Sequence, residues 1–215
     1  MTDEGYFKTT GRETIEKMIE KNEYPYRVVA GDEFFRYICV QCTLCCLEET
    51  PQLFPDDLKR LPDYLGISES EFLKKYCRLE EYEDGFKQIV LKKQGEGCIF
   101  LKNNGCVIHD QKPLRCKAQP LGSTRFKNPY TGREYYLLND HGCPGFINED
   151  SLNPTPLLVF NTTNSWTPQR WVERFNLNKL FVYHQKPHED KKKWNQWVTE
   201  KARIGKLKTK EVQNG

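Results

Sequence analysis

The sequence predicts an α+β fold: a small, irregular, metal-stabilised domain of short helices and hairpins, finished by a helical C-terminal segment. Two observations support this prediction. Short segments with helical or strand periodicity alternate with turns rich in Gly and Pro, and nine cysteines occur in 215 residues. Hydrophobic residues make up only 37% of the chain, so the core is modest and a bound metal is expected to contribute to stability.

The chain is predicted to have two parts. Residues 1–147 form a cysteine-cluster, metal-binding domain with an N-terminal helix, and residues 148–215 form a linker and a helical, basic segment packed on it. The linker prediction rests on a stretch rich in Asn, Pro, Ser and Thr over residues 148–165. Residues 186–210 contain nine Lys or Arg and three acidic residues, a local charge of +6, so the rest of the chain carries −3.

Helical periodicity and capping residues indicate most of the helices. Ser68 and Glu71 form a capping box for a helix over residues 69–76, and Pro62 is expected to end a helix over residues 56–61. Thr167 and Pro168 mark the start of the longest one. Helices are expected over residues 10–21, 56–61, 69–76, 169–185 and 189–203, with a short one after Pro113 that carries Cys116.

Strands are expected where apolar and polar residues alternate or β-branched and aromatic residues gather. These segments are residues 26–30, 86–92 and 135–138. Residues 99–101 and 107–109 are expected to pair as a hairpin across Lys102-Asn-Asn-Gly105.

Four cysteines within eight residues, in the run Cys39-x2-Cys42-x2-Cys45-Cys46, indicate a metal site. Thiolates are soft metal ligands, and a spacing of two residues lets successive sulfurs face one point. In an extended segment the adjacent Cys45 and Cys46 point in different directions, so the two need not bind the same ion.

Four further cysteines occur in turn-like sequences and complete eight candidate ligands: Cys98, Cys106, Cys116 and Cys143. Glycines precede Cys98 and Cys106; they let the backbone approach a metal, and backbone amides there can donate hydrogen bonds to thiolates. Cys77 has no glycine, histidine or second cysteine close by, so it is expected to be a buried structural thiol.

The spacing leaves the metal open between zinc and an iron–sulfur cluster. Zinc takes four thiolates, or three thiolates and an imidazole. A 4Fe-4S cluster also takes four cysteines, and Cys143-Pro144 resembles the distant Cys-Pro of ferredoxins. The N-terminus lacks the basic and apolar stretches of a secretory signal, so we expect a reducing cytoplasm, where cysteines serve metal or redox chemistry rather than disulfides.

For the histidines and for one charged pair, the sequence gives weaker evidence of a role at the metal site. His109 and His141 lie next to candidate cysteine ligands and are either ligands or surface residues. Asp57 and Arg60 are one helical turn apart and form either a pair that braces the cluster loop or an exposed pair of little energetic weight.

Taken together, these motifs resemble the YkgJ-type cysteine-cluster family, a zinc- or iron-chelating CxxCxxCC domain. The matching pieces are Cys39 to Cys46, Asp57-Leu-Lys-Arg60, Cys98-Ile-Phe-Leu101, Gly105-Cys-Val-Ile108, Lys112-Pro-Leu-Arg-Cys-Lys117, Pro120-Leu121 and Cys143-Pro-Gly145. The resemblance implies metal binding through Cys39, Cys42, Cys45, Cys46, Cys98, Cys106, Cys116 and Cys143.

The chain departs from the family pattern at four positions. Lysine stands at 112 and 117, where the family usually has arginine, histidine stands at 109 in place of tyrosine, and Gln119 replaces phenylalanine. Lysine keeps the positive charge but loses the planar fork that binds a carboxylate with two hydrogen bonds.

The leading hypothesis is therefore a protein that binds an iron–sulfur cluster, or zinc, in a structural, redox or accessory role for a protein partner. One alternative is an enzyme related to the flagellin lysine-N-methylases, which combine a similar cysteine domain with S-adenosylmethionine-dependent methyl transfer. The chain has no Gly-rich nucleotide loop of the usual kind. The other alternative is a nucleic-acid-binding module in the basic tail.

Overall fold

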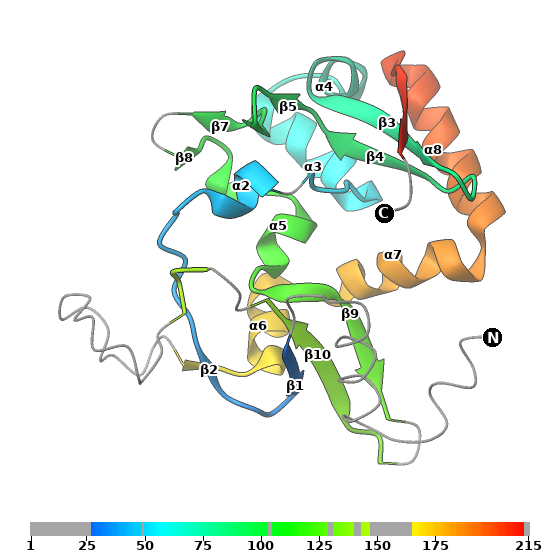
Figure 1. Cartoon of the computed structure of the whole chain (residues 1–215). Coiled ribbons are helices and arrows are strands. Elements are labelled where there is room, and N and C mark those ends of the chain that lie inside the picture. Colours follow the sequence, from blue (N-terminus) through cyan, green and yellow to red (C-terminus); the bar gives the residue numbers. More distant parts are fainter. Residues whose placement is uncertain are drawn as a thin grey trace. The chain divides into compact units, whose positions relative to one another are not determined.

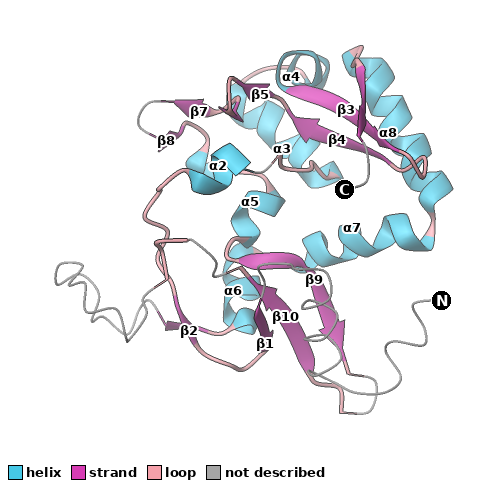
Figure 2. Ribbon diagram, viewed as in Figure 1, coloured by secondary structure: helices cyan, strands magenta, loops and turns pink. Residues whose placement is uncertain are grey.

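The computed structural model describes residues 27–48, 50–102, 105–128, 131–139, 143–146 and 165–212. The chain divides into two compact units, shown in Figures 1 and 2. Unit 1 comprises Met1–Val40 and Ala118–Asn178, and unit 2 comprises Gln41–Lys117 and Lys179–Gly215. Each unit is therefore assembled from two separate stretches of sequence.

Unit 1 is built on an antiparallel sheet of order β1-β10-β9, with β1 at Arg27–Ala30, β9 at Leu121–Lys127 and β10 at Glu134–Leu138. A second pair joins β2 (Phe35–Arg36) to β11 (Ser165–Trp166), which leads into α6 (Pro168–Phe175). Phe35 and Tyr37 pack on the indole of Trp171, whose Nε1 donates to the carbonyl of Ala118. An aromatic cluster therefore fixes α6 within this unit.

Unit 2 contains a three-stranded sheet of order β12-β3-β4, in which β12 runs parallel and β4 antiparallel to β3. The strands are β3 (Cys77–Tyr82), β4 (Lys87–Leu91) and β12 (Thr209–Val212). The helix α8 (Lys191–Gly205) packs along β4 and against α4 (Glu69–Tyr76). Its buried residues Trp194, Val198 and Ala202 recur every four positions, which gives the single apolar stripe of a surface helix.

The rest of unit 2 consists of short elements that lead to the cysteines. They are α2 (Leu44–Glu48), α3 (Pro55–Leu65), the hairpins β5–β6 (Lys93–Gln94, Gly97–Cys98) and β7–β8 (Leu101–Lys102, Gly105–Cys106), the 3-10 helix η2 (His109–Gln111), α5 (Leu114–Ala118) and α7 (Asn178–Glu189). Both α5 and α7 extend across a unit boundary by one residue. The predicted α+β class, with short helices, hairpins and a helical C-terminal segment, is confirmed.

The helix boundaries differ from the predictions at one proline and one asparagine. Pro62 lies inside α3, which continues to Leu65 and ends at Gly66 in the left-handed conformation. The helix predicted over residues 169–185 is two helices, because Asn176 adopts a left-handed φ of 53° and caps α6. The helix predicted over residues 69–76 is confirmed, since Ser68 accepts a hydrogen bond from the Glu71 amide.

The hairpin predicted at residues 99–109 exists in a different register. Leu101 pairs with Cys106 and Lys102 with Gly105, whereas residues 107–109 form a turn and the start of η2. The strands predicted at residues 26–30, 86–92 and 135–138 correspond to β1, β4 and β10. The helix predicted over residues 10–21, most of the linker and the predicted domain boundary at residue 147 lie outside the described residues.

Candidate metal centre

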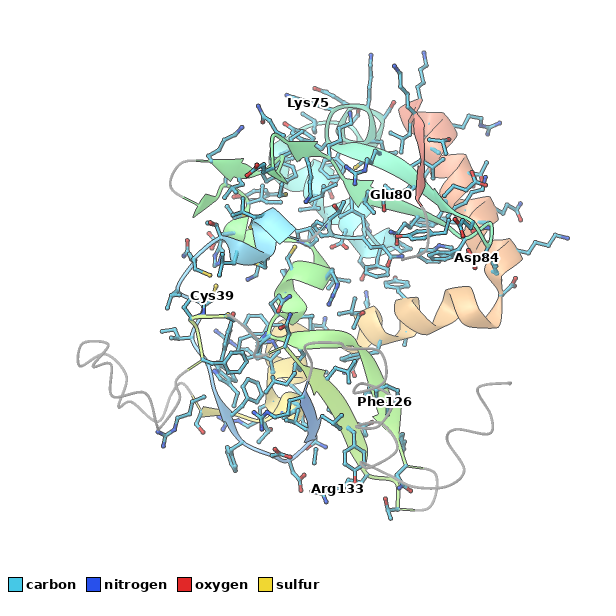
Figure 3. The ribbon with its side chains drawn as sticks, viewed as in Figure 1. Cys39, Lys75, Glu80, Asp84, Phe126 and Arg133 are labelled. Atoms are coloured by element: carbon cyan, nitrogen blue, oxygen red, sulfur yellow. The ribbon has the colours of Figure 1, made fainter. Side chains whose placement is uncertain are left out.

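The cysteine run occupies the loop that leads into α2. Cys39, Cys42 and Cys45 are exposed and Cys46 is half-buried; Cys39 is labelled in Figure 3. The helix begins at Leu44, so Cys45 and Cys46 lie in a helical turn and not in an extended segment. Their side chains are hydrogen-bonded to each other, and this bond lowers the pKa of Cys46. The expectation that they point in different directions is therefore wrong.

The backbone on either side of Cys42 is strained. Gln41 and Thr43 have φ values of 53° and 66°, in the left-handed region that non-glycine residues, and β-branched ones above all, rarely adopt. Such residues cost on the order of 1–3 kcal/mol each and cluster at functional sites. The Thr43 carbonyl accepts hydrogen bonds from the amides of Cys46 and Leu47, which start α2. The loop is thus held in a conformation that its residue types disfavour.

The next two cysteines, Cys98 and Cys106, lie in the hairpins, directly after Gly97 and Gly105. A Cβ at Gly97 would lie 2.8 Å from the side chain of Leu101, and Gly105 has a φ of 114°. The backbone amides of Phe100 and Leu101 donate to the thiol of Cys98, and that of Ile108 donates to Cys106. These donors lie two or three residues after each cysteine, and not at the glycines before it, where the sequence predicted them.

Cys116 lies on α5, which a buried carboxylate holds in place. Asp57 is fully buried, pairs with Arg60 at 2.9 Å, and accepts a hydrogen bond at Oδ1 from the amide of Leu114 at 3.0 Å. Arg60 also donates to the backbone carbonyl of Lys112 at 3.1 Å. The two predicted partners therefore form a buried brace, and it fixes the start of the Cys116 helix.

Five thiols of unit 2 lie close enough together for their charges to interact. The charge of Cys46 interacts with those of Cys98, Cys106 and Cys116, and each of these three interactions raises the pKa of Cys46. Cys45 interacts in the same way with Cys98 and with Cys106. Three stretches of sequence, residues 45–46, 98–106 and 116, therefore place their sulfurs within range of one another's charges.

The thiols of this group differ in how readily they ionise. Burial raises the pKa of Cys98 and of Cys106, although the ammonium of Lys112 lies close enough to Cys106 to oppose the effect. The hydrogen bond from Cys45 outweighs burial at Cys46. Within the described residues, no three His, Cys, Asp or Glu side chains converge closely enough to hold a metal ion. The group therefore contains the thiols that a metal site needs, but their sulfurs do not converge on one point.

Two of the predicted ligands, Cys39 and Cys143, belong to unit 1. There the chain before Cys39 pairs antiparallel with the chain after Cys143: Tyr37 bridges to Phe146, and the amide of Ile38 donates to the carbonyl of Gly145 at 3.0 Å. A Cβ at residue 145 would lie 2.5 Å from the Ile38 carbonyl oxygen, so this close approach needs glycine. The pairing brings Cys39 and Cys143 to the same end of one short ladder.

The remaining candidates are Cys77, His109 and His141, and the structure gives a different result for each. Cys77 is 1% exposed and burial raises its pKa strongly, in agreement with a structural thiol. The Nε2 of His109 is buried, and none of the described residues forms a hydrogen bond with it. Burial lowers the pKa of His109, which favours the neutral imidazole. His141 lies outside the described residues. Lys112 lies close to Cys106. The sequence did not predict this, because no local pattern connects the two residues.

The donor set suits a soft metal. All nine cysteines are present as thiols and not as disulfides, and several thiolates together with backbone N–H donors are the usual surroundings of zinc and of iron–sulfur clusters. No helix in the described part of the chain has the length and apolar character needed to cross a membrane.

Comparison with known proteins agrees with this chemistry. Residues 38–144 match the CxxCxxCC family, described as a "Putative zinc- or iron-chelating domain". No curated protein and no solved structure matches the chain.

Proposed function

Because residues 38–144 belong to the CxxCxxCC zinc- or iron-chelating family, we propose that this chain binds iron as a 4Fe-4S cluster, with zinc as the alternative occupant. The thiolates that we assign to metal binding within unit 2 are those of Cys42, Cys45, Cys46, Cys98, Cys106 and Cys116, of which a cluster takes four. Cys39 and Cys143 are a separate pair of candidate ligands within unit 1. Eight thiolates suit either two four-ligand sites or one cluster with spare sulfurs.

The observation that carries the proposal is the mutual interaction of five thiols from three stretches of sequence in unit 2. Isolated buried cysteines behave as small apolar residues and need no such neighbours. Bringing several ionisable thiols together disfavours their charged forms, a cost that a bound cation reverses. Cys77, buried alone in the same unit, provides the internal comparison.

The exposed loop around Cys42 can move to close the site. Cys42 and Cys45 are exposed and lie among the strained residues Gln41 and Thr43. A loop that is strained and exposed can change its backbone at little cost, so we infer that it closes on the metal as the metal binds. Cys39 and Cys143, held at one end of the unit 1 ladder, are candidate ligands of their own unit in this proposal.

The residues around the thiols prepare them for binding. Cys46, with its lowered pKa, is the first thiol that we expect to ionise, and the Lys112 ammonium favours the thiolate of Cys106. A bound cluster would cross-link the hairpins, α2 and α5, or transfer single electrons. The role is thus structural, redox or accessory to a protein partner. Nine thiols fit a reducing compartment such as the cytoplasm.

Anaerobic purification followed by an absorption scan and by iron, sulfide and zinc analysis tests the proposal. We expect brown protein with a broad visible band and with bound iron and sulfide. Colourless protein containing zinc would support the alternative occupant, and protein without either metal would reject both.

Serine substitutions test the assigned thiols in the same preparation. C98S and C116S should each lose most of the metal, whereas C77S should retain it because Cys77 is buried away from the group. Equal metal retention in C116S and C77S would contradict the assignment of Cys116. Near-ultraviolet circular dichroism of each variant checks that the fold survives.

A further inference from the structure

A second feature of unit 2 is independent of the cysteines: five exposed cationic side chains gather where α4 and α8 end. They are Lys74 and Lys75 at the end of α4, and Arg203, Lys206 and Lys208 at and just beyond the end of α8. We call these five residues the basic end. Lys75 is labelled in Figure 3.

Three contacts show that α4 and α8 lie side by side with the same direction. Glu69 pairs with Lys201 at 2.7 Å, the hydroxyl of Ser70 donates to the Ile204 carbonyl at 3.1 Å, and a Cβ at Gly205 would lie 2.5 Å from that of Leu73. Residues later in α4 therefore contact residues later in α8, so the two helices run in parallel. The C-terminal ends of the two helices lie together, although their sequences are far apart.

The strands that follow the helices extend this arrangement. β3 begins at Cys77, directly after α4, and β12 begins at Thr209, shortly after α8. The two strands pair in parallel, with Thr209 opposite Leu79. The segment that carries Lys206 and Lys208 therefore runs beside the junction of α4 and β3.

Cations at helix C-termini are common because they interact with the helix dipole and the last carbonyls. Here other groups already donate hydrogen bonds to those carbonyls. The ammonium of Lys92 donates to the carbonyls of Lys74 and Lys75 at 2.6 and 3.2 Å, and the amides of Lys206 and Leu207 donate to the last carbonyls of α8. Capping does not account for the basic end.

Charge pairing does not account for it either. On the neighbouring sheet and on α8, Lys87, Lys191 and Lys201 each pair with a carboxylate at 2.7–3.0 Å. Among the described residues, no carboxylate forms an ion pair with any member of the basic end. Glu71 and Glu200 are exposed one turn earlier on the same helices. The ammonium of Lys75 lies over the ring of Tyr76, 5.2 Å from its centroid. Within the described part of the chain, the other four members are exposed cations without an ion pair: Lys74, Arg203, Lys206 and Lys208.

We propose that the basic end binds the phosphate backbone of nucleic acid. Four of its five members are lysines, which are flexible point charges suited to spaced phosphates and not to reading base edges. The only large exposed apolar residue on these helices beside it is Ile204, whereas an amphipathic membrane-binding or protein-docking face needs a broader apolar area. The expected binding is therefore independent of sequence and sensitive to salt.

Fluorescence anisotropy with labelled 20-base-pair duplexes of RNA and of DNA tests this proposal on the full chain. With four or five phosphate contacts, the logarithm of the affinity should fall with the logarithm of the salt concentration with a slope of about −4. Tighter binding of one duplex would identify its class as the natural partner.

A matched pair of double variants locates the surface. K206Q/K208Q removes two charges from the basic end, while K192Q/K193Q removes two exposed charges from the first turn of the same helix, about 20 Å away. We expect K206Q/K208Q to weaken binding about tenfold or more and to reduce the salt slope by about 2, with K192Q/K193Q close to the unaltered protein. K74E/K75E should weaken binding at least as much as K206Q/K208Q.

Three results would overturn the proposal. One is no binding of either duplex at low salt. The second is an equal loss of affinity in the two double variants, which would mean that net charge alone acts. The third is tighter binding to polyglutamate or to phosphatidylserine vesicles than to the duplexes, which would assign the surface to an acidic protein or a membrane.

Discussion

Arg60 reaches Asp57 across one turn of α3, with 2.9 Å between Nη2 and Oδ1, and the carboxylate of this ion pair is fully buried. The same carboxylate accepts hydrogen bonds from the amides of Phe54 and Leu114. One side chain thus joins the start of α3 to the start of the Cys116 helix.

We expect D57N to lower the free energy of unfolding by about 2 kcal/mol. Both carboxylate oxygens accept hydrogen bonds, Oδ2 from the Phe54 amide and Oδ1 from the Leu114 amide and Arg60. The Asn side chain has only one acceptor oxygen, so a buried donor is left without an acceptor, which costs about 1–3 kcal/mol. Urea unfolding at pH 7 measures it. D63N, which changes an exposed acid on the same helix, should alter stability by less than about 0.5 kcal/mol. Similar losses in the two variants would contradict the brace.

The same residue predicts a pH dependence. Burial raises the pKa of Asp57 from 3.8 to about 6. The folded protein then holds this proton more tightly than the unfolded chain, so the contribution to stability is largest below about pH 4 and is lost as the pH rises towards about 6. The stability of the native sequence minus that of D57N should fall by about 3 kcal/mol over this range. A difference that is constant, or that rises with pH, would show that the Arg60 charge outweighs burial.

Relief of loop strain should stabilise the metal-free protein. Thr43 has a φ of 66°, which glycine adopts without a steric penalty. We expect T43G to raise the unfolding free energy by up to about 1 kcal/mol, measured by thermal unfolding after chelator treatment. T199G, in the middle of α8, should have the opposite sign, a loss of roughly 0.3 kcal/mol, because Thr is itself a weak helix former. Destabilisation by both variants would mean that Thr43 is not strained.

Lys112 should strengthen metal binding through its charge. Its ammonium lies close enough to Cys106 to favour the thiolate, and an interaction of this partly exposed kind is worth up to about 1 kcal/mol. We therefore expect K112Q to weaken Co²⁺ or Zn²⁺ binding about threefold to fivefold in a competition titration at pH 7. K112R, which restores the residue usual in the family, should bind as the native sequence does. Weakening by K112R equal to that by K112Q would exclude a purely electrostatic role.

Local signals in the sequence predicted the local structure well. The Ser68 capping box determined the limits of α4, and Gly97 and Gly105 precede Cys98 and Cys106 as expected. Pro62 did not end α3. The helix ends instead at Gly66, which forms the left-handed cap. Asn176, which divides the predicted long helix, is a residue type known for that conformation, so this break could have been predicted.

The arrangement of the candidate site depends on packing that no local pattern encodes. Spacing identified the thiols as a set, but the grouping of Cys46 with Cys98, Cys106 and Cys116 arises from α2, the hairpins and α5 folding together. The buried state of Asp57 likewise depends on Leu114, which is distant in sequence.

The parallel pairing of β12 with β3 has a consequence for biosynthesis. A ribosome completes Cys116 well before it reaches Val212, and at 5–20 residues per second the interval is about 5–20 s. During that time the cysteine loop, the hairpins and α5 have been synthesised, while the sheet of unit 2 still lacks β12. The thiols are therefore open to oxidants and to stray metal ions before the sheet beside them is complete.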